Sequence, residues 1–177
     1  IMAGKRIADI AAALPQARAI VRAMPNLPAA IGEGITGAVA NAAVTPAQRD
    51  GAHRLLAAVG RVEWLAEEAQ VDAVTAVSGS GPAYVFYLTE CLAAAGRAAG
   101  LPEDVAERLA RATIEGSGAL LAREPGTSPA QLRINVTSPG GTTAAALDVL
   151  MAPGGGLAPL VEAAVLSARR RAQELSG

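Results

Sequence analysis

The sequence predicts an α/β segment over residues 1–71 followed by an all-helical domain over residues 72–177. In the first segment, short apolar runs bounded by turn residues alternate with capped helical stretches. From Asp72 onward, the apolar spacing and the positions of Gly and Pro are typical of successive helices. Because 51% of the residues are apolar but only one Trp, two Tyr and one Phe occur, the core must consist mainly of Ala, Leu, Val and Ile.

The first segment contains three strand candidates and two helix candidates. We expect strands at the short apolar runs RAIVRAM, GITGAVAN and RVEWLA, and a short helix at RIADIAAAL. A longer helix is predicted over 45–60, because Thr45 can cap it, Pro46 suits its first position and Gln48 can close a capping box. Gly60 then ends that helix.

The second segment is predicted to be helical throughout. We expect helices over residues 81–100, 101–122, 128–135, after the Ser-Pro-Gly-Gly of 138–141, and over 157–175. Alanine and glycine recur on these helices, which permits close approach of one helix to another. A small helical domain exposes many apolar positions that a second copy could cover, so we expect a homo-oligomer with the helical domain as its interface.

Composition and charge exclude several classes of function. The net charge of -1 gives no general attraction to nucleic acid or to an anionic membrane. No apolar run approaches the roughly 20 residues needed to span a bilayer. The single Cys91 allows no internal disulfide, which favours a reducing, cytoplasmic compartment, and we expect its thiol to be buried. No metal-ligand spacing occurs, and the single His53 is expected to lie on the surface rather than act as a base.

The stretch NVTSPGGTTAAAL, residues 135–147, is the strongest site candidate. Gly140 and Gly141 lack a Cβ, so a ligand could approach the backbone closely. The N–H groups of the helix start carry a partial positive charge and bind carboxylate or phosphate, while Ser138, Thr142 and Thr143 add hydroxyls. A small amino-acid-like ligand would fit. The alternative is an ordinary turn in which a threonine caps the helix.

Two further stretches are weaker candidates. Ser78, Gly79, Ser80 and Gly81 form a flexible turn before Pro82, which is also explained by glycines that let two helices pack. Met24, Pro25 and Asn26 end a predicted strand, and ligands of open α/β sheets bind at the carboxyl ends of strands. A simple Pro-Asn turn explains the same residues.

Three motifs follow one another along the chain: VRAMPNLPAAIGEGITG, VDAVTAVSGSGPAYVFYL and LRINVTSPGGTTAAALDVL. Together they resemble the pyrroline-5-carboxylate reductase family, which catalyses the last step of proline synthesis, and the similarity extends over nearly the whole chain. The resemblance implies a dinucleotide-binding Rossmann domain followed by a helical domain that forms a homodimer, with larger rings of dimers in the family. It also implies hydride transfer from NADPH or NADH, with NADP the preferred cofactor, to L-1-pyrroline-5-carboxylate.

The resemblance assigns roles to the candidate residues. Ser138, Gly140, Gly141 and Thr142 would hold the substrate carboxylate, and Thr143, the catalytic candidate, would hydrogen-bond the ring nitrogen. Met24, Pro25 and Asn26 would face the nicotinamide. No metal is implied. Such a site needs little acid-base machinery, because an iminium is already electrophilic and the cofactor supplies the hydride.

The glycine-rich dinucleotide fingerprint of the family is not in this sequence. Residues 1–71 would therefore be the last portion of a Rossmann domain, and we expect the chain by itself to be catalytically incomplete. Two alternatives stay open. One is another reductase of the β-hydroxyacid dehydrogenase type, which would use a helix lysine, whereas Lys5 is the only lysine here. The other is a helical dimerisation module without activity.

Overall fold

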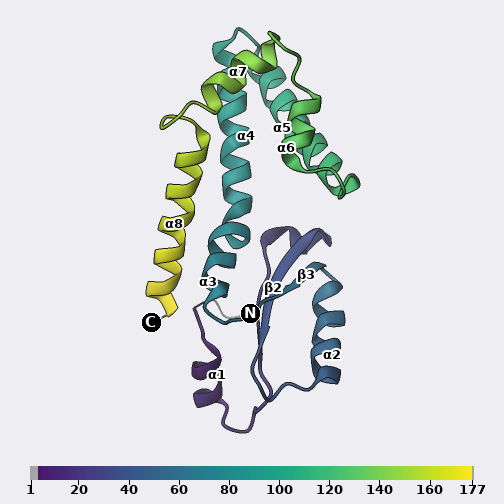
Figure 1. Cartoon of the computed structure of the whole chain (residues 1–177), viewed down its shortest axis with the longest axis vertical. Helices are drawn as coiled ribbons and strands as arrows, with labels where there is room; N and C mark the ends of the chain where they lie inside the picture. The colour runs from purple at the N-terminus through teal and green to yellow at the C-terminus, as the bar shows by residue number, and fades with distance from the viewer. Residues whose placement is uncertain (1–3, 177) are drawn as a thin grey trace. The chain divides into compact units, whose positions relative to one another are not determined.

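The computed structural model describes residues 4–176 (Figure 1). The chain packs as two compact units, one formed by the residues up to Pro82 together with those from Ala163 onward, the other by Ala83–Glu162. The borders of these units fall inside two helices, α4 (Gly81–Ala98) and α8 (Leu157–Ser176). The domain boundary between residues 71 and 72 was predicted from the sequence pattern, and it stays a prediction.

The first unit contains a three-stranded sheet in the order β1-β2-β3. β1 runs antiparallel to β2, and β3 runs parallel to β2. All three predicted strands and both predicted helices are present, but α2 ends at Ala57, and Gly60, which was predicted to end this helix, begins β3 instead. The elements of this unit before α4 are α1 (Ile7–Ala13), β1 (Val21–Met24), η1 (Leu27–Ile31), β2 (Gly34–Ala40), α2 (Pro46–Ala57), β3 (Gly60–Trp64), α3 (Gln70–Val74) and η2 (Thr75–Gly79).

The crossover from β2 to β3 is specified by local sequence. Thr45 Oγ1 accepts a hydrogen bond from the Gln48 backbone N–H at 3.3 Å, and Gln48 Oε1 accepts one from the Thr45 N–H at 2.9 Å. This is the predicted capping box, and it starts α2. Gly60 has a φ of +141°, and a Cβ there would collide with the backbone of Gly34. Glycine is therefore required where the parallel pairing of β3 with β2 begins.

Trp64 joins α2 to β3. Its Nε1 donates to His53 Nδ1 at 3.3 Å, and the Arg49 guanidinium carbon lies 4.5 Å from the centre of the Trp64 ring. His53 is exposed, as expected, and its contact is a structural one.

The centre of the first unit lies along β2. Thr36, Ala38 and Val39 are buried, as is Val71 of α3. A Cβ at Gly37 would lie 2.8 Å from Val74 Cγ1, so the missing side chain lets α3 pack closely on β2.

The two outer strands of this sheet differ. Along β3 the exposure alternates, and the charged Arg61 and Glu63 are exposed. Every residue of β1 is half-buried, and the strand has one charged residue, Arg22, whose side chain is only 11% exposed. β3 thus has the solvated, charged character of an edge strand, whereas β1 has that of an interior strand.

The second unit is helical, as predicted. It contains most of α4 and the beginning of α8, together with α5 (Glu103–Arg123), α6 (Pro129–Asn135) and α7 (Thr142–Leu150). α4 and α5 approach through small residues, since a Cβ at Gly96 would lie 3.1 Å from the Ala106 Cβ. Within residues 4–176, no helix is long and apolar enough to cross a membrane.

The core of the helical unit contains no large side chain. Among its described residues, the buried hydrophobic ones are Ala93, Ala106 and Ala110. Cys91 is exposed, so the expectation of a buried thiol was wrong. The reason is that no layer of the same unit covers this face of α4. Large apolar side chains are exposed on these helices, among them Val85, Phe86, Tyr87, Leu109, Leu121, Val149 and Leu160.

Candidate functional site

The loop before α7 is a tight turn whose two glycines have separate backbone reasons. The Gly141 N–H donates to the Ser138 carbonyl at 3.0 Å, with Pro139 and Gly140 at the two central positions. Gly140 has a φ of +70°, which matches the third position of a type II turn. A Cβ on Gly141 would lie 3.1 Å from the Ser138 carbonyl oxygen. The turn therefore favours glycine at Gly140 for its backbone conformation and at Gly141 for its tight contact, whether or not a ligand approaches.

The first turn of α7 has free hydrogen-bond donors. Gly141 is the N-cap and no side chain caps the helix, so the alternative of a threonine cap was wrong. The first N–H groups of a helix have no intrahelical partner and carry a partial positive charge. Thr143 is half-buried and Thr142 is exposed. This end of α7 can therefore offer several N–H groups and nearby hydroxyls to a small carboxylate.

The residues before the Ser138–Gly141 turn are tied to α6. Thr137 Oγ1 donates to the Arg133 carbonyl of α6 at 2.6 Å. Arg133 Nη1 lies 3.3 Å from the sulfur of Met151, just past the carboxyl end of α7. The arginine thus sits where a cation complements the helix dipole, at the opposite end from the free N–H groups. In this geometry an anion at Thr142 and Thr143 would meet backbone N–H groups and hydroxyls.

Met24, Pro25 and Asn26 lie in the first unit, at the carboxyl end of β1. Asn26 Oδ1 accepts the Ile35 N–H at 2.9 Å, which ties the turn after β1 to the start of β2. This leaves the amide nitrogen of Asn26 as the group of that side chain able to face a ligand. Because β1 is antiparallel to its neighbour, Asn26 lies beside the amino ends of β2 and β3. The expectation that a ligand binds at the carboxyl ends of strands therefore holds here for β1 alone, because the carboxyl ends of β2 and β3 lie at the opposite edge of the sheet.

Met24 also contacts the second candidate stretch. A Cβ at Gly79 would lie 3.0 Å from the Met24 methyl carbon, so this methyl packs against the glycine backbone. Gly79 ends η2, a π-helical turn in which the Ser80 N–H donates to the Thr75 carbonyl at 2.8 Å. Such turns are rare and often occur at functional sites. The structure thus brings Met24 and Gly79 together in the first unit, while residues 138–143 belong to the second.

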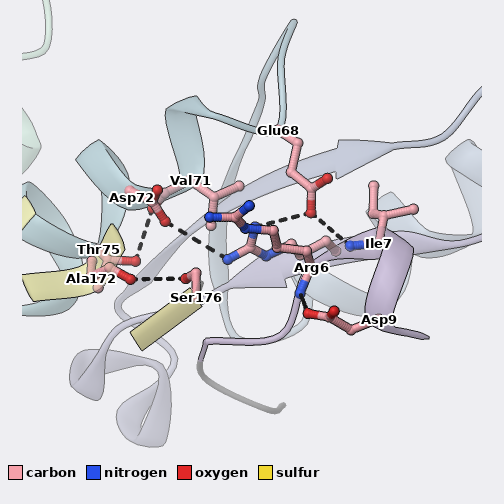
Figure 2. A network of polar contacts seen from close by, with 10 residues as sticks. Arg6, Ile7, Asp9, Glu68, Val71, Asp72, Thr75, Ala172 and Ser176 are labelled. Carbon is pink, nitrogen blue, oxygen red and sulfur yellow. Dashed lines mark hydrogen bonds and ion pairs between the residues drawn. The ribbon is translucent and has the colours of Figure 1, made fainter. Parts of the chain in front are cut away.

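Sequence reasoning missed a charged cluster in the first unit. Arg22 Nη1 lies 3.0 Å from Glu68 Oε1, and Arg22 Nη2 lies 4.0 Å from Asp72 Oδ1 (Figure 2). Glu68 Oε1 also accepts the N–H of Ile7, at 2.7 Å. The available signal was Arg22 in the middle of the apolar run RAIVRAM, because a cation in a buried strand requires an anionic partner. Among the described residues, no group of three or more His, Cys, Asp or Glu could hold a metal ion.

Known proteins resemble this chain over nearly its whole length. Residues 68–175 match the family model described as pyrroline-5-carboxylate reductase dimerisation. A pyrroline-5-carboxylate reductase from Pseudomonas aeruginosa is 47% identical over 99% of this chain and 63% of that protein. The chain thus spans about 63% of the length of this curated relative.

Solved structures agree. A pyrroline-5-carboxylate reductase from Coxiella burnetii superposes with a TM-score of 0.91 at 42% identity, over 99% of this chain and 64% of that one. The Plasmodium falciparum enzyme, solved with NADP bound, gives a TM-score of 0.82 at 29% identity, over 99% of this chain and 68% of that one. These likenesses confirm the predicted fold class, a remnant of a Rossmann domain followed by a helical dimerisation domain. The chain belongs to the pyrroline-5-carboxylate reductase family.

Proposed function

We propose that this chain is the substrate-binding and dimerisation part of an enzyme that reduces L-1-pyrroline-5-carboxylate to L-proline. A hydride adds to the imine carbon and a proton is added at the nitrogen, while NADPH or NADH is oxidised. The observation that carries the proposal is the uncapped start of α7 behind a rigid turn. The chain spans about 63% of its relative's length, and we propose that the complete reaction also needs a dinucleotide-binding part.

The start of α7 suits the substrate's negative end. We assign the substrate carboxylate to the N–H groups at Thr142 and Thr143, with the Ser138 hydroxyl beside them. The bare backbone at Gly140 and Gly141 leaves room for the ring. The Thr143 hydroxyl is then the partner of the ring nitrogen, where it orients the imine and can stabilise the protonated form. A single well-placed hydrogen bond to a charged group contributes about 1.5–3 kcal/mol.

We assign the nicotinamide side to Met24, Pro25 and Asn26. The Met24 methyl against Gly79 supplies an apolar wall, and the Asn26 amide nitrogen supplies a donor. We assign these residues to the nicotinamide end alone, because the Gly-x-Gly-x-x-Gly pattern of residues 32–37 leads into strand β2 and not into the helix start that holds a pyrophosphate. When bound, the cofactor supplies the hydride. We favour NADP, which is bound in the Plasmodium falciparum structure.

Self-association of the helical unit belongs to the same proposal. A groove of about 780 Å³ runs between α4 and α5, and its lining includes Val85, Phe86 and Ile114 together with Arg97 and Arg111. Exposed apolar side chains beside a groove of this size suit a second copy of the chain. We propose a homodimer, from which larger rings of dimers could assemble. We propose no nucleic-acid or membrane partner, and we place the enzyme in the cytoplasm, which suits a chain with one cysteine.

The alternatives lead to different measurements. A β-hydroxyacid dehydrogenase would need a helix lysine, and Lys5 is the only lysine. For the chain alone, the match to a dimerisation model favours a second candidate function, a helical association module. The test uses two proteins, the chain alone and the "completed protein", which is this chain preceded by the dinucleotide-binding part of the Pseudomonas aeruginosa relative.

The assay follows NADPH oxidation with L-1-pyrroline-5-carboxylate and the formation of proline. We expect turnover by the completed protein and little or none by the chain alone. A completed protein that folds, binds NADPH and produces no proline would contradict the proposal. Turnover of a β-hydroxyacid instead would favour the other reductase class.

A further inference from the structure

Arg22 is the central group of the charged cluster in the first unit. Its side chain is only 11% exposed, and it meets two carboxylates, those of Glu68 and Asp72, which Figure 2 labels. Asp72 is buried, and Glu68 is about one-third exposed. Two carboxylates thus share one guanidinium in a site with little solvent. Arginine suits this position because its planar fork can address two acceptors at once, whereas the lysine ammonium is a point charge.

The cluster lies on the same elements as the proposed nicotinamide side, because Arg22 shares β1 with Met24 and Asp72 lies on α3, which leads to Gly79. Arg22 precedes Met24 by two residues on β1, so both side chains leave the strand on the same face. Glu68 and Asp72 lie just before and within α3, which continues without a break into η2 and Gly79. At the far end of these two elements, the Met24 methyl packs against Gly79. The Arg22 pairs therefore connect β1 to α3 and the residues before it, two residues before the Met24 that contacts Gly79.

The surroundings give the strand end room to shift if this clamp is lost. A cavity of about 60 Å³ lies in the first unit, lined by Arg22, Met24, Asp72 and Thr75, and by Ala172 and Ser176 of α8. Met24 thus borders unfilled space on this side, although its methyl packs closely against Gly79. The ion pairs of Arg22 supply directional interactions between β1 and the segment that holds Glu68 and Asp72.

We propose that Arg22 is a positioning residue for hydride transfer. By pairing with Glu68 and Asp72 it fixes the Met24–Asn26 turn against Gly79, and so fixes the wall on which the nicotinamide ring rests. This inference rests on the proposed function. Arg22 touches neither substrate nor cofactor in this scheme. Its loss changes the geometry of the reacting atoms and leaves the binding of the distant parts of the cofactor intact.

The test uses the completed protein and single-turnover mixing of the enzyme–NADPH complex with L-1-pyrroline-5-carboxylate. The first-order rate constant reports geometry and does not depend on how much protein is active, whereas the amplitude reports the active fraction. We expect Arg22→Lys to lower the rate constant at least about tenfold, since misplacement by 1 Å can cost about a hundredfold. The amplitude and the NADPH dissociation constant should stay within about twofold of the parent.

The matched control is Arg171→Met. Arg171 pairs with Glu174 at 2.7 Å on the same unit, but both side chains are more than half exposed. Its rate constant should equal the parent's. Asp72→Asn, which keeps the Arg22–Glu68 pair, carries the same test if Arg22→Lys does not fold, and should lower the rate constant in the same direction.

Each outcome decides the matter. An unchanged rate constant in the folded variants, or a lower amplitude at an unchanged rate constant, overturns the positioning role while the proposed function stands. A parent protein that forms no proline overturns the proposed function itself, and the positioning role with it.

Discussion

Phe86 offers the sharpest test of self-association through the helical unit. It lies on α4, lines the groove between α4 and α5, and is 55% exposed in the single chain. An aromatic side chain buries roughly 150–250 Å² when fully covered, so about 80–140 Å² of Phe86 is left for a partner to cover. At about 25 cal/mol per Å², that area corresponds to about 2–3.5 kcal/mol per copy.

Phe86→Ala removes most of that contribution from both copies of a symmetric dimer. We expect a loss of about 3–6 kcal/mol in dimerisation free energy, which raises the dimer dissociation constant by about two to four powers of ten. The measurement is sedimentation velocity of the completed protein over a range of concentrations. Circular dichroism of the same samples checks that the helix content is kept.

Leu55→Ala provides the matched control. Leu55 is 76% exposed, but it lies on α2 in the first unit and does not line the groove. Its loss should leave the dissociation constant unchanged. An unchanged dimer in Phe86→Ala would refute the reasoning from exposed apolar area. Equal weakening by both substitutions would show that the groove is not the interface.

Three further substitutions test the site and the fold. Thr143→Ala should lower kcat/KM for L-1-pyrroline-5-carboxylate by about 10- to 150-fold, the equivalent of one hydrogen bond to a charged group, while Thr143→Ser keeps most activity and both remain dimeric. Gly140→Ala meets no atom within 4 Å but must keep a φ of +70°, so urea unfolding should show a loss of about 1–2 kcal/mol. Thr45→Ala removes the cap of α2 and should lower the free energy of unfolding by about 1 kcal/mol, measured by urea unfolding followed by Trp64 fluorescence. An unchanged free energy of unfolding in that variant would contradict the capping-box assignment.

Local signals in the sequence predicted the local structure well. The capping box at Thr45 and Gln48 depends on residues three apart, so it can be recognised without knowing the rest of the fold. The strands were recognisable because each apolar run is short and ends at turn residues. The helix after Ser138–Gly141 was predicted too, but the cap is Gly141 and the glycines serve the turn itself.

Features that depend on distant parts of the chain could not be predicted. The direction of β1 relative to β2 is a matter of tertiary pairing, and it changed which strand ends lie near Asn26. The partners of Arg22 are 46 and 50 positions away, and no local pattern connects them. Cys91 was expected to be buried because its helix is apolar, but that face has no cover within its own unit.

The contrast between β1 and β3 has a consequence for handling the chain in isolation. β3 carries charged side chains on its open side, which discourage the addition of another strand. β1 has no such protection, since its single charge is engaged by Glu68. We expect copies of the isolated chain to associate edge to edge along β1, in addition to pairing through their helices. Precipitation of the isolated chain would therefore report on the open edge of β1, and added charge beside β1 should keep the chain in solution without disturbing the helical pair.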